Sequence, residues 1–201
     1  MHGLEKLFAN NRAWAIAREQ SDPGFFQRLC AIQRPDYLWI GCADSRVPAN
    51  EIVGLDPGEL FVHRNVANIV PPGDVNALAV IQYAIETLGI GHIIVTGHYG
   101  CGGVLAAFSE DGAPPLGDWV DHVRRVRDAH AAELDALPDQ DARWRRLCEL
   151  NVAAQVRAVN ATPLVQAART RGQPLIVHGC IYDLHDGLLR DLNISTGGPQ
   201  V

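Results

Sequence analysis

Short apolar runs, each bounded by turn residues, divide most of the chain into regular segments. They cover residues 37–41, 59–63, 92–96 and 175–182. Continuous apolar runs of this length are typical of strands that are buried on both faces of a parallel sheet. The sequence therefore predicts four strands, and their spacing leaves room for a helix between consecutive strands.

The segments between these runs have helical periodicity. Residues 76–88 place apolar side chains on one helical face and end before Gly89. Residues 117–171 are predicted to be mostly helical, with breaks near Pro138 and at Pro163. Strands that alternate with helices predict an α/β fold, with a mainly parallel β-sheet flanked by helices.

The two ends of the chain add further elements. Apolar positions predict a helix over residues 3–18 and a shorter aromatic one after Gly24, so residues 1–30 form an N-terminal helical arm. So many apolar side chains need a surface to pack on, either the core of the same chain or another subunit. An Asp-Gly turn at Gly187 predicts that residues 188–194 form an antiparallel edge strand. We expect a single domain over residues 1–201, with an α/β core at 37–194.

Composition excludes several classes of protein. The 201 residues carry a net charge of −6, and no run of Lys and Arg suggests a nucleic-acid partner. The arginines at 124–127 and 143–146 have acids nearby and are predicted to lie on solvated helix faces. No apolar stretch reaches the ~18 residues of a membrane span, and no signal peptide is evident. Five cysteines without disulfide-like spacing suggest reduced thiols and a cytoplasmic location.

Four residues whose side chains can bind a ligand lie where the predicted strands end. Cys42 follows the first strand, Arg64 the second and His98 the third, and Tyr182 closes the fourth. Ligands of open α/β sheets bind outside the carboxyl ends of the strands. We therefore expect one functional site at this edge.

Two thiols and one imidazole in this set suit a zinc ion, namely Cys42, His98 and Cys101. Three protein ligands leave one position for water, whose pKa a zinc ion lowers toward ~7, which indicates a catalytic site. Asp44 lies two residues after Cys42, where it can orient that water or occupy the open position itself. Arg46 can pair with Asp44 bidentately and hold it off the metal.

Other interpretations of these residues stay open. Asp44 as a fourth ligand would make the zinc purely structural. The remaining cysteines are predicted to be packing residues, namely Cys30, Cys148 and Cys180. The histidines of the strands are predicted to be core or edge residues, namely His63, His92 and His178, whereas His185 is predicted to lie on the surface.

The elements C-x-D-x-R at 42–46 and H-x-x-C at 98–101, with FVHRNVAN at 61–68, are similar to those of the β-class carbonic anhydrases. The chain resembles this family from the arm to about Leu192. The resemblance implies reversible hydration of carbon dioxide to bicarbonate and a proton, with one zinc ion per subunit. It also implies a homodimer or homotetramer in which the N-terminal helices wrap the neighbouring subunit.

The resemblance further implies roles for single residues. Zinc would be held by Cys42, His98 and Cys101, Asp44 and Arg46 would form the catalytic pair, and the backbone around Gly102 would position the substrate. Trp39, Arg64 and Tyr182 match the bacterial, bicarbonate-regulated type II subtype, in which these three side chains bind bicarbonate at a non-catalytic, allosteric pocket. Bicarbonate there would displace residues 44–47, so that Asp44 leaves Arg46 and binds zinc.

Two other functions are compatible with these residues. One is hydrolysis of a related small heterocumulene such as carbon disulfide. The other is a non-catalytic, structural-zinc bicarbonate sensor, which predicts four protein ligands at every pH and no turnover. The enzyme hypothesis predicts instead that activity rises with pH, as Asp44 is displaced from the metal.

Overall fold

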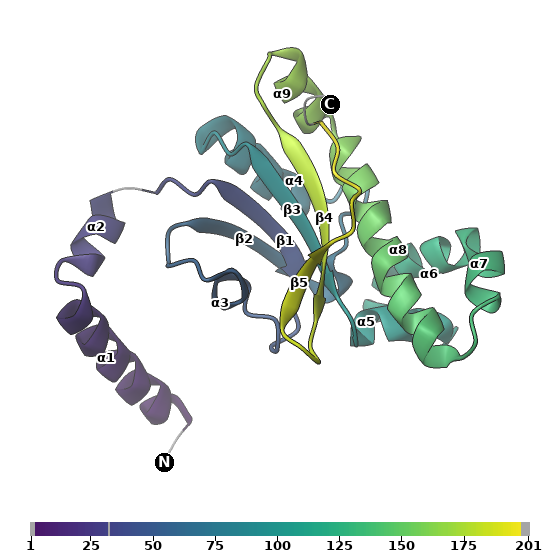
Figure 1. Cartoon of the computed structure of the whole chain (residues 1–201), viewed down its shortest axis with the longest axis horizontal. Coiled ribbons are helices and arrows are strands. Elements are labelled where there is room, and N and C mark those ends of the chain that lie inside the picture. The colour runs from purple at the N-terminus through teal and green to yellow at the C-terminus, as the bar shows by residue number, and fades with distance from the viewer. Residues whose placement is uncertain (1–2, 32, 198–201) are drawn as a thin grey trace. The chain divides into compact units, whose positions relative to one another are not determined.

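The chain divides into two compact units, Met1–Arg34 and Pro35–Val201, and the computed structural model describes residues 3–31 and 33–197 (Figure 1). The first unit holds the helices α1 (Gly3–Ser21) and α2 (Phe25–Ala31). The prediction of two helices here is confirmed, and α1 runs three residues further than expected. The predicted arm begins at residue 1, so its first two residues lie outside the described part.

The second unit is built on a five-stranded sheet with the order β2-β1-β3-β4-β5. The strands are β1 (Tyr37–Cys42), β2 (Leu60–Asn65), β3 (His92–His98), β4 (Ile176–Asp183) and β5 (Leu188–Asp191). The strands β1 to β4 pair with one another in parallel, and β5 pairs with β4 in antiparallel orientation. The predicted fold class is confirmed, and the edge strand is shorter than predicted.

Helices connect the strands, and several begin at a side-chain cap. They are α3 (Ala49–Val53), α4 (Val75–Gln82) with a π-helical turn η2 (Tyr83–Thr87), α5 (Gly102–Leu105), α6 (Leu116–Ala129), α7 (Ala131–Asp135), α8 (Gln140–Asn160) and α9 (Pro163–Thr170). Short 3-10 turns lie at η1 (Val66–Asn68) and η3 (Ala106–Phe108). Asp74 caps α4, Asp139 caps α8 and Thr162 caps α9, each accepting backbone N–H groups of the first turn.

The long helical stretch from 117 to 171 is confirmed, with the breaks near Pro138 and before Pro163. An additional break at His130 separates α6 from α7. The short helix α3 was not predicted, because five residues are too few to show a helical period.

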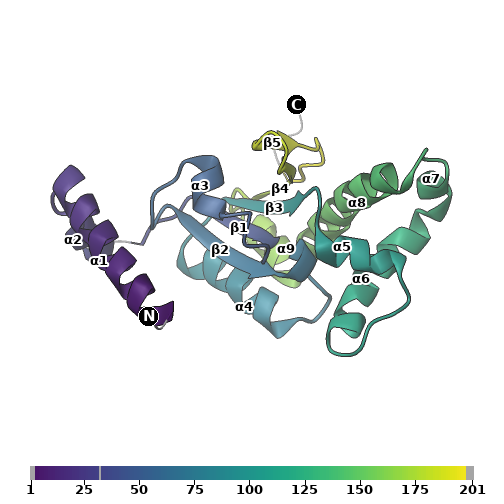
Figure 2. The ribbon, with the colours of Figure 1, turned by 90° about the horizontal axis from the view of Figure 1, so that it is seen from below.

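Helices cover the two faces of the sheet unequally. On one face, Ile40 of β1 and Val95 of β3 belong to a large core that also holds Ile81 of α4 and Val156 of α8. On the other face, Trp39 forms a smaller cluster with residues of β2 and α3. Figure 2 shows α4 and α3 on opposite sides of the sheet. The large core fixes the sheet against α8, whose polar side chains reach the site described below.

The carboxyl ends of β1 to β4 meet at one edge. Gly41 pairs with Arg64 between β1 and β2, and His98 pairs with Tyr182 between β3 and β4. Cys42 is the last residue of β1. The prediction that these four strand ends share an edge is confirmed.

Candidate metal centre

Three predicted ligands converge at this edge. The thiols of Cys42 and Cys101 and the imidazole of His98 are buried, and their ligand atoms lie within 4.8 Å of one another. The two sulfur atoms are 3.8 Å apart. Across residues 3–31 and 33–197, no other group of three His, Cys, Asp or Glu side chains comes this close. The chain brings them together because Cys42 ends β1, His98 ends β3 and Cys101 precedes the first turn of α5.

The hydrogen bonds of His98 suit metal ligation. Its Nδ1 lies 3.0 Å from the carbonyl oxygen of Tyr99, which can only accept, so Nδ1 carries the proton. The lone pair is therefore on Nε2, which is buried and has no hydrogen-bond partner among the described residues. An orphaned imidazole nitrogen beside two thiols fits a divalent ion that prefers nitrogen and sulfur ligands, such as zinc.

The electrostatics of the two thiols point the same way. A hydrogen bond from Cys101 lowers the pKa of Cys42, and the backbone N–H groups of Asp44 and Ala67 lower it further. The same contact with Cys42, together with burial, raises the pKa of Cys101. One proton is thus shared between two sulfur atoms, and a divalent cation would displace it.

Asp44 and Arg46 form a bidentate pair beside these ligands. Arg46 donates from Nε to Oδ1 of Asp44 at 3.0 Å and from a terminal nitrogen to Oδ2 at 2.7 Å, and its backbone N–H adds a bond of 2.9 Å. The hydrogen bonds from Arg46 hold the pKa of Asp44 well below its usual range. Oδ2 of Asp44 lies 3.7 Å from Nε2 of His98, so the carboxylate faces the ligand cluster while Arg46 holds it.

Of the residues predicted to bind bicarbonate, Arg64 and Tyr182 lie at this edge, whereas Trp39 lies three residues before the end of β1. Arg64 donates to the carbonyl oxygens of Cys42 at 2.8 Å and Asp44 at 2.5 Å, and so holds the backbone of the site loop. Trp39 is fully buried, and its Nε1 has no partner among the described residues. The half-buried Tyr182 accepts a backbone hydrogen bond from Tyr99 at 3.0 Å.

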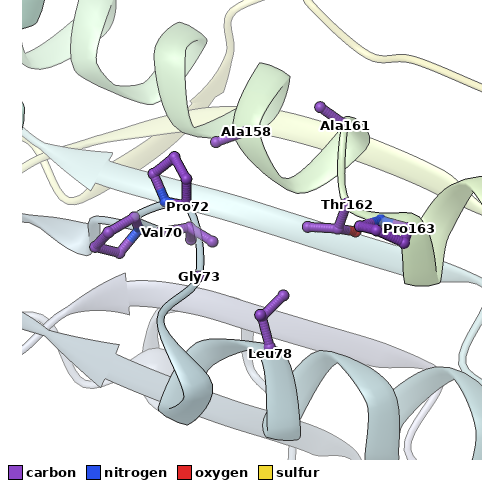
Figure 3. A pocket seen from close by; sticks show the side chains of 9 residues that line it. Val70, Pro72, Gly73, Leu78, Ala158, Ala161, Thr162 and Pro163 are labelled. Atoms are coloured by element: carbon purple, nitrogen blue, oxygen red, sulfur yellow. The ribbon is translucent and has the colours of Figure 1, made fainter.

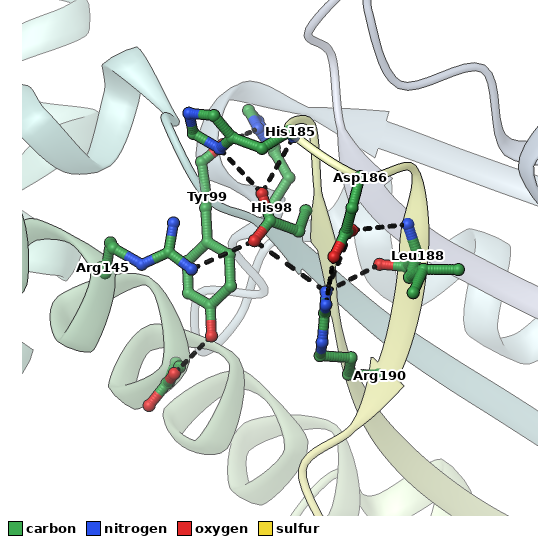
Figure 4. Close-up of polar contacts among 9 residues, drawn as sticks. His98, Tyr99, Arg145, His185, Asp186, Leu188 and Arg190 are labelled. Carbon is green, nitrogen blue, oxygen red and sulfur yellow. Dashed lines mark hydrogen bonds and ion pairs between the residues drawn. The ribbon is translucent and has the colours of Figure 1, made fainter.

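A network behind the H-x-x-C turn was missed in the sequence (Figure 4). Tyr99 donates its hydroxyl to Glu149 at 2.5 Å, and burial raises the pKa of Tyr99 to about 12. The guanidinium of Arg145 lies 3.7 Å from the centre of the Tyr99 ring and pairs with Asp183 at 3.1 Å. Asp183 also accepts from the backbone N–H of the exposed His185 at 3.0 Å.

The solvated-face prediction is incomplete for Arg145, whose side chain is 36% exposed but whose guanidinium packs on this aromatic ring. It is wrong for Arg124, which is only 9% exposed and donates to the backbone of Gly117 and Ser109. A helical charge pattern alone cannot separate an inward arginine from a solvated one, because both positions have acidic neighbours.

The structure confirms most, but not all, of the other residues that were predicted to pack in the core or at a strand edge. Cys148 is buried and Cys180 half-buried, as expected, and His63 is buried too. The imidazoles of His92 and His178 stack and lie 3.1 Å apart at their ring nitrogens. Cys30 is exposed in α2, so its prediction as a packing residue is wrong within the single chain, because the arm forms a unit of its own.

A separate hollow of about 220 Å³ lies between α4 and the junction of α8 with α9 (Figure 3). Its lining is apolar apart from one threonine, and comprises Val70, Pro71, Pro72, Gly73, Leu78, Ala158, Ala161, Thr162 and Pro163. None of these side chains titrates or is a common metal ligand. The chemistry of the chain is therefore at the sheet edge and not in this hollow.

Comparison with known proteins agrees with the geometry. The family model described as carbonic anhydrase matches residues 37–189. A carbonic anhydrase of Emericella nidulans is 50% identical over 194 residues, which cover 96% of this chain and 85% of that protein. Another from Pseudomonas aeruginosa is 37% identical over 84% of this chain and 78% of its own length.

Solved structures extend the similarity. The Coccomyxa β-carbonic anhydrase in complex with acetazolamide superposes with a TM-score of 0.94 at 42% identity, covering 98% of this chain and 90% of that one. A tetrameric β-carbonic anhydrase from Sordaria macrospora gives 0.91 at 40% identity, covering 98% and 100%. The chain belongs to the β-class carbonic anhydrases, and it is an enzyme of the lyase class. Within the described residues, no helix has the length and apolar character needed to cross a membrane.

Proposed function

We propose that this protein uses one zinc ion per subunit to catalyse the reversible hydration of carbon dioxide to bicarbonate and a proton. The observation that carries the proposal is the buried cluster of Cys42, His98 and Cys101, with an unpartnered imidazole nitrogen aimed into it. The cluster has the ligand types of a zinc site. Family membership supplies the reaction.

Zinc held by these three residues would act as a Lewis acid that makes a water molecule acidic near neutral pH. The chain's own contribution is to orient that water. Asp44, kept ionised by Arg46, accepts a hydrogen bond from the attacking water and so directs its lone pair at the substrate. The backbone around Gly102, at the start of α5, is proposed to position carbon dioxide.

The substitution Asp44→Ala tests these roles. We expect zinc content to stay near one per subunit, and carbon dioxide hydration in stopped-flow measurements to fall about 100-fold or more, since an orienting acceptor is lost. Asp118→Ala, at an exposed position of α6, is the control and keeps both values. A large loss of zinc in Asp44→Ala would instead support the structural-zinc sensor, in which Asp44 is a ligand.

Regulation through Asp44 is the finer part of the proposal. Bicarbonate bound by Trp39, Arg64 and Tyr182 would compete for the Arg64 guanidinium, which donates to the carbonyl oxygens of Cys42 and Asp44. Loss of those bonds would free the loop and let Asp44 leave Arg46 for the metal. Support would be activity that rises between about pH 6.5 and 9 and falls on adding bicarbonate, whereas a flat profile contradicts the gating.

Assembly is also a proposal. We expect a homodimer or homotetramer, as the tetrameric relative from Sordaria macrospora suggests. Large apolar side chains of α1 are exposed in the single chain and offer a surface for another subunit, namely Leu4, Leu7, Phe8, Trp14 and Ile16. A cytoplasmic location stays a prediction from the sequence.

A further inference from the structure

The turn η1 beside the metal centre has an unusual backbone. Ala67 has φ 63° and ψ 25°, and Asn68 has φ 48°, so two consecutive non-glycine residues are in the left-handed region. Both are buried. Each such residue costs about 1–2 kcal/mol, so the surrounding contacts must hold the turn in place.

Two buried amides of α8 supply those contacts. Asn151 donates from Nδ2 to the carbonyl oxygen of Ala67 at 2.9 Å, although 84 residues separate them. Gln155 donates from Nε2 to Oδ1 of Asn151 at 3.0 Å, and its Oε1 accepts from the backbone N–H of Val70 at 2.9 Å. Asn151 is fully buried and Gln155 is 5% exposed.

The direction of this relay is determined by chemistry. The N–H of Val70 can only donate, so it must face the oxygen of Gln155 and not its nitrogen. The amide nitrogen of Gln155 then faces Asn151, whose oxygen accepts and whose nitrogen is left to donate to Ala67. Every buried amide group of the relay that faces the turn has a partner, which makes the arrangement rigid.

The 3-10 turn η1 lies beside the metal ligand Cys42. Cys42 pairs with Asn65, the residue before η1, and the N–H of Ala43 donates to the carbonyl oxygen of Asn65 at 2.8 Å. Cys42 and Ala67 pack in the same core cluster, and the N–H groups of Ala67 and Asp44 face the Cys42 sulfur. A second anchor comes from Trp119 of α6, whose Nε1 donates to the carbonyl oxygen of Val66 at 2.9 Å. The left-handed backbone of Ala67 thus turns its N–H toward Cys42 and its carbonyl toward α8.

We propose that Asn151 and Gln155 are positioning residues for the metal ligand Cys42. By holding η1 they keep the N–H of Ala67 on the Cys42 sulfur, and so limit how much charge that sulfur donates to the metal. The inference rests on the proposed zinc site and assigns a role to two residues that touch neither metal nor substrate. Hydrogen bonds to ligating sulfur tune a bound metal in this way, and loss of such partners weakens binding.

Cobalt(II) in place of zinc gives a readout that does not depend on turnover. Asn151→Leu has a similar shape and no donor, and Gln155→Met removes the support of Asn151 more mildly. In both we expect the thiolate-to-cobalt charge-transfer band to move to longer wavelength, because a sulfur without its N–H partner is more electron-rich. We also expect transfer of the metal to a chelator to be about 10- to 100-fold faster in Asn151→Leu, and less so in Gln155→Met.

Val159→Ala is the matched control. Val159 is a fully buried core residue of α8 with no hydrogen bond to η1. Its replacement by alanine therefore lowers the stability of the fold without changing the contacts of the turn. It should keep the wild-type band and transfer rate. A folded Asn151→Leu, or Gln155→Met if the first variant does not fold, with wild-type band and rate overturns the inference. Failure of the wild-type protein to bind cobalt or zinc would instead overturn the proposed function.

Discussion

Adjacent glycines at the start of α5 differ sharply in the space around them. A Cβ atom on Gly103 would lie 2.6 Å from Cγ1 of Val66 and 3.1 Å from Cβ of Ala67. A Cβ atom on Gly102 would meet nothing within 4 Å. Gly103 is therefore what allows η1 to pack against the turn that carries Cys101.

We accordingly predict that Gly103→Ala lowers the free energy of unfolding by about 1–3 kcal/mol, because the side chain forces η1 away. Gly102→Ala should be neutral or slightly stabilising, since alanine favours a helix over glycine. Urea denaturation of the two metal-free variants measures the difference. Equal effects of the two substitutions would show that the close contact at Gly103 relaxes without cost.

At the scale of elements, α8 supports both halves of the metal centre. Trp144 donates to the carbonyl oxygen of Cys101 at 2.9 Å, and Asn151 acts on the turn beside Cys42. Between them, Arg145 connects the Tyr99 ring with Asp183 at the end of β4. One helix thus ties the ends of β3 and β4 to the loop after β2.

The contact of Asp183 predicts sensitivity to acid. Hydrogen bonds from the backbone and ring of His185, and then from Arg145, hold the pKa of Asp183 well below its usual range. A carboxyl whose pKa is lower in the folded chain stabilises it above the unfolded pKa of about 3.9, and the stabilisation is lost as pH falls below that value.

Between about pH 5 and 3, Asp183→Asn should therefore reduce the uptake of protons on unfolding by up to about one proton, and so flatten the dependence of stability on pH. Urea denaturation of metal-free protein at several pH values measures this slope. Asp118→Asn, at an exposed position, should keep the wild-type slope. A wild-type slope in Asp183→Asn would mean that the carboxyl contributes nothing to acid sensitivity.

At the scale of the whole molecule, the helix α1 carries a series of exposed large apolar side chains. Leu7 and Phe8 of α1 are each 59% exposed in the single chain. Within the arm, Trp14 packs its ring on Phe26 at 5.6 Å between centroids. An arm with this much exposed apolar surface is expected to bury it in a subunit interface.

We predict that the double substitution Leu7→Glu and Phe8→Glu in the full chain yields a smaller assembly than the wild type, because two carboxylates would have to be buried in the interface. Light scattering coupled to size-exclusion chromatography gives the mass. Asn11→Glu, at an exposed polar position of α1, should leave the mass unchanged. An unaltered mass for the double variant would place these two side chains outside any interface.

The sequence by itself determined the α/β class, four parallel strands and the candidate ligands Cys42, His98 and Cys101. These follow from local patterns, because an apolar run and the residues directly after it lie within a few positions of one another. Asp44 and Arg46 could be paired for the same reason, as they are two residues apart.

Tertiary structure alone decided which side chains support that site. Asn151 reaches Ala67 across 84 residues of chain, and Arg145 meets Asp183 across 38. Such contacts depend on how α8 lies on the sheet, which no local periodicity encodes. For that reason Arg145 was predicted to be solvated, Asn151 was not singled out, and Gly103 was indistinguishable from Gly102. Local pattern determined which residues are able to bind a metal, and long-range packing decided what holds them in position.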